Sequence, residues 1–336
     1  MDPCLHPHLF HHHGQYVAHD IAPFPFQPNL ALQFAYCSTP VFHDIVPPSF
    51  IAWVEDSFPR HNDLPWDEKI DERVMWRGSN TGMNFDESSR WRWSQRPRLV
   101  NVTNQLEGFE PVLLPTSQDP QKRRSTPIGT GTPVRRSLLN PAMTDIAFTG
   151  YPLGCESDYC DYIAAQFPFL PKQDSGGLDA GRHKYLVDVD GHGWSSRFKR
   201  LITGNALVFK ATVYPEWWLD RIQPWVHYVP IQVDYSDLYD ALAFFRGGFD
   251  TGAGDSNGNA TMGGNDTVTR GVGGKRAKAI PGRDGEDELA REIASAGREW
   301  SRTFWRKEDM TAYFWRLILE IARLSGERDG QDDLDM

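Results

Sequence analysis

The segment KYLVDVDGHGWSSRFKRLITGNALVFK, residues 184–210, constrains the fold more than any other part of the chain. Its apolar run at 185–189 is short and rich in β-branched residues, which predicts a buried strand. Residues 190–193 then form a glycine-bearing turn, and Ser195 or Ser196 stands where a helix N-cap belongs. A short basic helix and a second strand complete the segment. Strands that alternate with helices in this way predict a parallel α/β sheet.

The start of this basic helix favours the binding of a diphosphate. A helix N-terminus offers unpaired main-chain N–H groups and the positive end of the helix dipole. With a capping serine and Arg197 one turn in, the loop 192–197 is a candidate site for a nucleotide or nucleotide sugar. The alternative is a capped surface helix with a basic face, and the residues alone leave both open. A nicotinamide cofactor fits poorly, because Gly191 and Gly193 form only half of a dinucleotide fingerprint and Trp194 crowds the turn.

Composition narrows the class of protein. The 336 residues suit two domains or one large one, and the apolar and charged fractions are ordinary for a globular protein. The net charge of −10 argues against a nucleic-acid partner. The start MDPCLHPHLFHHHG lacks the pattern of a signal peptide, and no apolar run is long enough to cross a bilayer. We therefore expect either a cytosolic protein or a chain that lacks its natural start.

The cysteines and sequons leave the compartment open. Cys155 and Cys160 could close a small loop and Cys4 could pair with Cys37, but the sequence does not decide either pairing. No CxxC pair occurs, which argues against a zinc site. Glycosylation sequons, which are used in a secretory compartment, begin at Asn101, Asn259 and Asn265.

Several further elements can be predicted along the chain. Residues 73–76 are typical of a short strand before a turn, and a helical pattern runs from Asp86 towards Arg98. The basic stretch 115–145 predicts a solvated loop. Residues 224–230 predict a strand bounded by prolines, after which Ser236 caps another helix.

The residues offer the two chemical elements that an inverting sugar transfer requires. The departing diphosphate must be neutralised, and Ser195, Ser196 and Arg197 could do so, with Arg77 and Ser79 as a second wall. A carboxylate must also remove the proton of the acceptor hydroxyl. Among many acidic residues we favour Asp44, because it lies in an aromatic and proline-rich loop rather than on a charged helix face. A helix-capping role for Asp44 is the alternative.

Several separate motifs in consistent order resemble glycosyltransferase family 90, in particular a fungal-type member. The family contains the Rumi-type protein O-glucosyltransferases and the fungal capsule-associated xylosyltransferases. The resemblance covers roughly residues 36–325 apart from a Gly-rich insertion. Its motifs are PWDEKIDERVMWRGSNTG, YLVDVDGHGWSSRFKRL, LVFK, PEWW, PWVHYVPIQVDYSDLYD and LAREIASAGREWSRTFWRKEDMTAYFWRLILEIARL.

The resemblance implies an α/β fold of the GT-B type, in which two Rossmann-like halves face a cleft. It also implies inverting transfer of xylose or glucose from a UDP-sugar to a hydroxyl of a glycan or protein, in the ER or Golgi lumen, with no cofactor required. The His43-Asp44-Ile45 context makes Asp44 the general base. The donor would contact Ser79, Arg90 and the loop residues His192, Gly193, Trp194, Ser195, Ser196 and Arg197.

The same resemblance divides the chain into parts. The half before Asp44 is too short for a complete Rossmann-like unit, so we expect part of it, and any upstream membrane anchor, to be missing here. The expected parts are a partial acceptor-side half at 1–65, a donor-binding Rossmann-like half at 66–245, a Gly-rich mobile insertion at 246–284, terminal helices at 285–325 and an acidic tail at 326–336.

Two other functions remain possible on the sequence. Asp188 and Asp190 form a DxD pattern, which could hold a divalent cation in a metal-dependent GT-A transferase. A catalytically inactive remnant that binds only UDP or sugar is the second alternative. The need for a divalent metal is left open.

Overall fold

The computed structural model describes residues 5–18, 32–49, 63–113, 131–171, 180–248 and 285–332. Its centre is a six-stranded sheet in which every pair of neighbouring strands is parallel. The strands are β1 (Asp71–Gly78), β4 (Thr144–Thr149), β5 (Phe169–Leu170), β6 (His183–Val189), β7 (Leu207–Ala211) and β8 (Val229–Pro230).

The order of the strands marks one edge of the sheet as the place for a ligand. Across the sheet the order is β5-β4-β1-β6-β7-β8, so the chain winds outwards from β1 and then winds outwards again from β6 in the other direction. This is the doubly wound arrangement of Rossmann-like folds. The reversal between β1 and β6 opens a crevice at the carboxyl ends of these two strands, where such folds bind ligands. The expected parallel α/β sheet is therefore confirmed, whereas a second facing half remains a prediction.

Alternation of side chains along the strands builds two packed faces. On β6, Tyr185, Val187 and Val189 join the largest apolar cluster, and Leu186 and Asp188 point to the opposite face. Burial of each large apolar side chain contributes roughly 1.5–3 kcal/mol. The helices that supply side chains to the large cluster are α2 (Gln95–Asn104), α4 (Arg136–Met143), α7 (Leu238–Arg246) and α8 (Asp287–Phe304).

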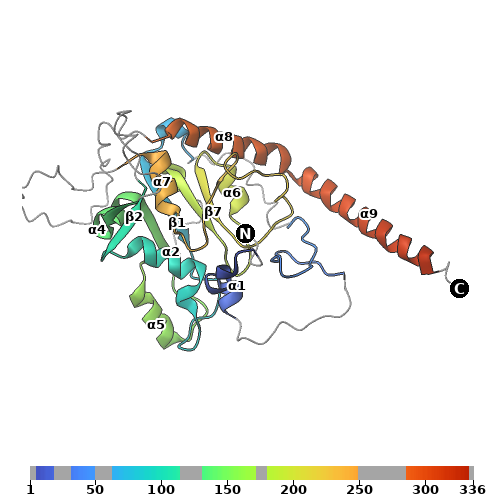
Figure 1. Cartoon of the computed structure of the whole chain (residues 1–336), viewed down its shortest axis with the longest axis horizontal. Coiled ribbons are helices and arrows are strands. Elements are labelled where there is room, and N and C mark those ends of the chain that lie inside the picture. Colours follow the sequence, from blue (N-terminus) through green and yellow to red (C-terminus); the bar gives the residue numbers. More distant parts are fainter. Residues whose placement is uncertain are drawn as a thin grey trace, which may run out of the picture.

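Short helix α6 (Phe198–Ile202) packs on the other face of the sheet. Phe198 and Ile202 cluster there with Val208 of β7 and with aromatic residues that precede β8. From the end of α8, helix α9 (Lys307–Asp332) extends away from the sheet (Figure 1) and exposes Trp315. In the part of the chain that is described, no helix combines the length and apolar character that a membrane span requires.

Smaller elements complete the fold. Strands β2 (Phe109–Val112) and β3 (Thr132–Arg135) form an antiparallel pair, and a disulfide joins Cys155 to Cys160 at the start of α5 (Ser157–Gln166), as one of the open pairings suggested. The remaining helical turns are the 3₁₀ helices Pro7–His11, Trp66–Glu68, Trp91–Trp93 and Ala180–Arg182 and the short helix α1 (Gly14–Val17).

Several predicted boundaries are wrong. The expected helix at 86–98 begins at Gln95, because the Asp86 carboxylate accepts hydrogen bonds from following main-chain N–H groups and forms a turn instead. Much of the expected loop at 115–145 is ordered as β3 and α4, since buried Leu139 and Met143 anchor it to the core. The strand expected at 224–230 is reduced to its last two residues.

Other predictions fall outside the described residues. These are the Gly-rich stretch from 249 to 284, the sequons at Asn259 and Asn265, and the extreme carboxyl end. The helix capped near Ser236 is present and begins at Leu238. The division of the chain into an acceptor-side part and a donor-side part remains a prediction.

Candidate functional site

The carboxyl ends of β1 and β6 are joined by one buried arginine. The Arg197 guanidinium donates from Nη1 to the carbonyl oxygen of Arg77 at 2.7 Å and from Nη2 to that of Val189 at 3.1 Å. The same group lies 5.4 Å from the centre of the Trp76 ring. Burial lowers the pKa of Arg197, and nearby Asp188 and Asp190 partly oppose this. The sequence-predicted donor residue thus holds the two strand ends of the crevice together.

The predicted N-cap of the basic helix is wrong. Helix α6 begins at Phe198, its N-cap is Arg197, and no side chain caps it. The Ser195 hydroxyl instead donates to the carboxylate of Asp188, which also receives Lys210 Nζ at 2.9 Å. A fully buried carboxylate needs donors more than an exposed helix end does, since water can satisfy the latter. With only five residues, α6 gives less support to an anion than the sequence suggested.

A second buried arginine, which the sequence analysis missed, lies in the same crevice. Arg96, near the start of α2, donates from Nε to the Asp190 carbonyl at 2.9 Å and from Nη1 to the Ser79 carbonyl at 2.8 Å and Thr81 Oγ1 at 2.6 Å. Burial and the charge of Arg197 lower the pKa of Arg96 to about 9. Two guanidinium groups that repel each other at a strand-end crevice favour an anion beside them.

Glycines make room for both guanidinium groups. A Cβ atom at Gly78 would lie 3.0 Å from Nη1 of Arg197, and one at Gly191 would lie 3.0 Å from Nη2 of Arg96. Any other residue at these positions would push the arginines away from the strand ends. The glycines of the predicted turns are therefore explained by close packing rather than by a dinucleotide fingerprint.

Asp190 connects the crevice to distant segments. Its carboxylate accepts from Thr212 Oγ1 at 2.8 Å and from the Val213 main-chain N–H at 2.9 Å, and it lies 3.2 Å from Nε2 of His13. Asp188 and Asp190 are both 0% exposed and already bound by protein donors. Neither carboxylate is therefore positioned to coordinate a cation as the DxD alternative requires.

Two further charged groups lie beneath the crevice. Burial opposes the charge of Lys210, yet the carboxylates of Asp188 and Glu216 raise its pKa to about 12. Burial raises the pKa of Glu216 to about 8, and the charges of Asp188 and Asp190 act in the same direction. Lys210 is therefore the partner of Asp188, and Glu216, 3.8 Å from Nζ, is protonated at neutral pH.

The segment that carries the candidate base lies against the loop after β6. Asp44 is half-buried, and its Oδ2 accepts from the Ser38 hydroxyl at 2.7 Å. The Tyr36 ring lies 6.1 Å from the ring of Trp194, centre to centre. A Cβ atom at Gly193, where φ is +138°, would approach Cys37 Sγ to 2.8 Å. These contacts bring residues 36–44 to the same edge of the sheet as the loop 192–197.

Cys37 adds to the description of this contact. Burial raises the pKa of its thiol, and the carboxylates of Asp190, Glu216 and Asp44 raise it further. Cys37 is not in a disulfide with any described residue. Its suggested partner Cys4 lies outside the described residues.

An apolar groove flanks the candidate base. It has a volume of about 560 Å³ and lies between residues 34–48 and the first turns of α9. Its walls include Tyr36, Pro47, Pro48, Met310 and Phe314. A groove with these walls can hold an apolar side chain beside Asp44.

Other predicted residues are placed differently. The Arg77 guanidinium turns to Asp145, 2.7 Å away near the amino end of β4, so it does not reach the crevice. Arg90 is exposed ahead of the 3₁₀ helix Trp91–Trp93, while buried Arg96 occupies the crevice. His192 and Ser196 are exposed and Ser79 is half-buried beside the crevice. A basic residue at a helix start, where the dipole disfavours it, is the signal that could have identified Arg96.

A cluster of possible metal ligands lies at the opposite edge of the sheet. Asp71, Asp145 and His183 place their ligand atoms within 4.8 Å of one another. Arg73 and Arg77 form ion pairs with these carboxylates at 2.6 and 2.7 Å. Because the negative charges are already neutralised, the cluster is a structural ion-pair network.

Comparison with known proteins places similarity on the segment that forms the crevice. The family model described as Glycosyl transferase family 90 matches residues 170–251, which include β6, the following loop, β7 and α7. Protein O-glucosyltransferase 2 of Danio rerio is 26% identical over 192 residues, which are 57% of this chain and 29% of that protein. Protein O-glucosyltransferase 3 of Homo sapiens is 32% identical over 212 residues, which are 60% of this chain and 31% of that protein. The chain spans less than a third of the length of these relatives.

Proposed function

We propose that this chain, which belongs to glycosyl transferase family 90, transfers a sugar from a UDP-sugar to a hydroxyl group of a protein or glycan. The observation that carries the proposal is the pair of buried arginines, Arg96 and Arg197, at the strand-end crevice between β1 and β6. An enzyme that releases UDP must stabilise the charge of the departing diphosphate, and fixed guanidinium groups do this without reorganisation.

In this proposal the donor diphosphate lies against the loop 192–197, beside Ser79 and the two arginines. Main-chain N–H groups and the exposed Ser196 hydroxyl complete the cradle. The arginines are held by main-chain carbonyls and keep their positive charge close to the diphosphate. A divalent cation is not required by this arrangement, since protein cations already face the anion.

Asp44 is the proposed general base. Its carboxylate takes the proton of the acceptor hydroxyl while the acceptor oxygen forms a bond to the anomeric carbon. The bond from that carbon to the β-phosphate oxygen breaks with its electron pair, and UDP leaves from the opposite face, so the anomeric configuration inverts. The contact of residues 36–44 with Trp194 supports this role.

The acceptor is proposed to be a protein, with a glycan as the alternative. The relatives are named protein O-glucosyltransferases, which favours a protein hydroxyl and glucose, with xylose as the other sugar. One pocket residue can decide between two sugars that differ by a hydroxymethyl group. The apolar groove beside Asp44 supports a side chain of a protein acceptor.

The proposed location is the lumen of the ER or Golgi, and the proposed architecture is GT-B, with the six-stranded sheet as the donor half. The disulfide between Cys155 and Cys160 supports an oxidising compartment.

A panel of UDP-sugars tests the proposal. The purified chain should bind UDP in calorimetry and release UDP from one sugar donor when a folded acceptor protein is present. Binding without release would identify the inactive remnant, and absence of both would reject the proposed function.

A further inference from the structure

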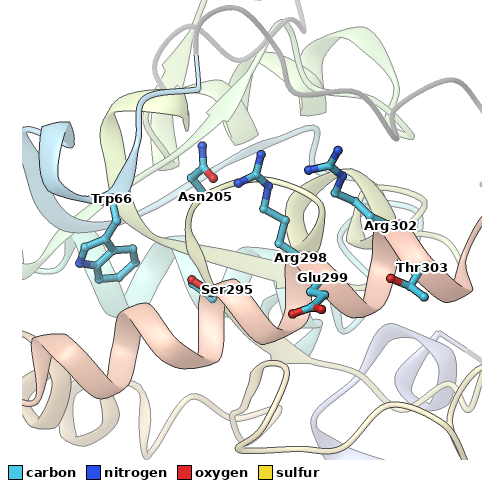
Figure 2. Close-up of a pocket in the computed structure, with 8 residues that line it drawn as sticks. Trp66, Asn205, Ser295, Arg298, Glu299, Arg302 and Thr303 are labelled. Atoms are coloured by element: carbon cyan, nitrogen blue, oxygen red, sulfur yellow. The ribbon is translucent and has the colours of Figure 1, made fainter.

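The opposite edge of the sheet holds a cavity of about 340 Å³ that the proposed function does not use. It lies between α8 and the loops that precede β1 and β7, so it is at the amino ends of the strands. Figure 2 shows Trp66 and Asn205 on one side of it and the α8 residues Ser295, Arg298 and Arg302 on the other. The proposed donor crevice lies at the other ends of the same strands.

Two arginines give this cavity a positive charge. Arg298 and Arg302 are one helical turn apart on α8, and their guanidinium groups point to the same side of the helix (Figure 2). Like charges at this spacing destabilise a helix by about 0.2–0.5 kcal/mol. Within the described residues, neither guanidinium has a carboxylate within ion-pairing distance, whereas the exposed Arg291 of the same helix is paired with Glu288.

Arg298 also has an unused donor. Its Nε atom is buried and has no hydrogen-bond partner in the part of the chain that the structure describes. A buried donor without a partner is unfavourable, and more so when it belongs to a charged group. An anion in the cavity would supply the missing acceptor.

The acidic residues near the cavity do not neutralise it. The carboxylate of Glu299 is turned away from both guanidinium groups (Figure 2). Asp63, close to Asn205, accepts from the Asn205 main-chain N–H at 2.7 Å and is paired with Lys69 Nζ at 2.8 Å. The charge of Asp63 is thus already balanced, and the cavity keeps the charge of its arginines.

We propose that this cavity binds the oxyanion, carboxylate or phosphate, of a small ligand about the size of a monosaccharide. The two guanidinium groups would contact the anion, because their planar forks match the oxygens of both groups. The amide of Asn205 and the hydroxyl of Ser295 would bind neutral oxygens of the ligand. The volume exceeds that of a bare ion, since one water occupies about 30 Å³ in the liquid.

Calorimetry with two probes, glucuronate and glucose 6-phosphate, tests the proposal on the full chain. Saturable binding of at least one probe is expected, and the probe that binds more tightly identifies the kind of oxyanion. Arg298→Gln and Arg302→Gln should each weaken this binding at least tenfold. Arg291→Gln is the matched control, because it removes a guanidinium of the same helix outside the cavity, and it should bind like the unmodified chain.

UDP binding keeps this test separate from the proposed function. All three variants should retain the UDP affinity of the unmodified chain, which also shows that they are folded. If Arg298→Gln fails to fold, exposed Arg302 still provides the test. Absence of saturable binding of both probes, or equal binding by Arg302→Gln and the unmodified chain, would overturn the proposal even if UDP binds normally.

Discussion

The guanidinium of Arg197 donates to the main-chain carbonyl of Arg77 over 2.7 Å, across 120 residues of sequence. This contact joins the end of β1 to the loop after β6 at the point where the strand order reverses. A side chain that the sequence suggests as a ligand contact is thus also part of the framework of the crevice. Substitutions at Arg197 therefore combine effects on folding with effects on binding, and Arg96 and Asp44 offer cleaner tests.

Arg96→Lys should lower the affinity for UDP about tenfold and leave the affinity for uridine nearly unchanged. Lysine keeps the charge but loses the fork that Arg96 uses for Ser79 and Asp190. Calorimetry with both ligands measures the difference. Arg90→Lys is the control, since Arg90 is exposed outside the crevice and should behave like the unmodified chain. Equal losses for UDP and uridine would separate Arg96 from the diphosphate.

Asp44→Asn should reduce sugar transfer by a factor of about 10² to 10⁴ while UDP affinity is kept, because a general base contributes about this much. UDP release and acceptor modification measure the change. Ser38→Ala, which removes the hydrogen bond to Asp44, should have a smaller effect. An Asp44→Asn variant that keeps full turnover would remove Asp44 from the role of base.

Transfer should continue in excess EDTA, because the carboxylates of Asp188 and Asp190 are engaged by protein donors. The rate with and without the chelator, and after addition of Mn²⁺, is the measurement. Complete loss with EDTA and recovery with Mn²⁺ would favour the metal-dependent alternative.

Lys210→Met should destabilise the fold by about 3–5 kcal/mol, because it leaves the buried carboxylate of Asp188 without its cation. The free energy of unfolding in urea at neutral pH measures the change. Lys184→Met is a suitable control, since its partners Glu72 and Asp287 are exposed. Similar losses for both lysines would contradict the assigned importance of the buried pair.

Glu216 should make the protein less stable as pH rises. The pKa of its carboxyl is about 8 in the folded chain and near its ordinary value of 4.5 when unfolded. Between these values the unfolded state loses the proton that the native state keeps, so stability falls as pH increases and this contribution is complete above pH 8. Urea unfolding at pH 5, 6.5 and 8 should therefore show a shallower decline for Glu216→Gln than for the unmodified chain. Parallel pH profiles would contradict the protonated state.

The sequence predicts those features that depend on neighbouring residues. The apolar run at 185–189, the glycine turn after it and the strand before Ser79 are local patterns, and they place two loops at one edge of a parallel sheet. The spacing of Cys155 and Cys160 likewise permits the disulfide that is found.

Features that depend on distant partners could not be predicted. Ser195 has the local pattern of an N-cap, but a buried carboxylate takes its hydroxyl. Arg77 turns to Asp145, 68 residues later, and local sequence contains no information about that partner. Arg96 was overlooked because the helix begins later than its pattern suggests, so a residue expected inside a helix lies at its start.

The bonds of Asp190 bear on how the chain responds to limited proteolysis. His13 meets this buried carboxylate, the N–H of Gly14 donates to the Gln95 side chain, and Leu9 packs against Val213. A peptide comprising residues 5–18 would therefore stay attached after a backbone cleavage that follows it, and the nicked protein would elute as a single species on size exclusion. Only denaturant would release the peptide, in the manner of a non-covalent subunit.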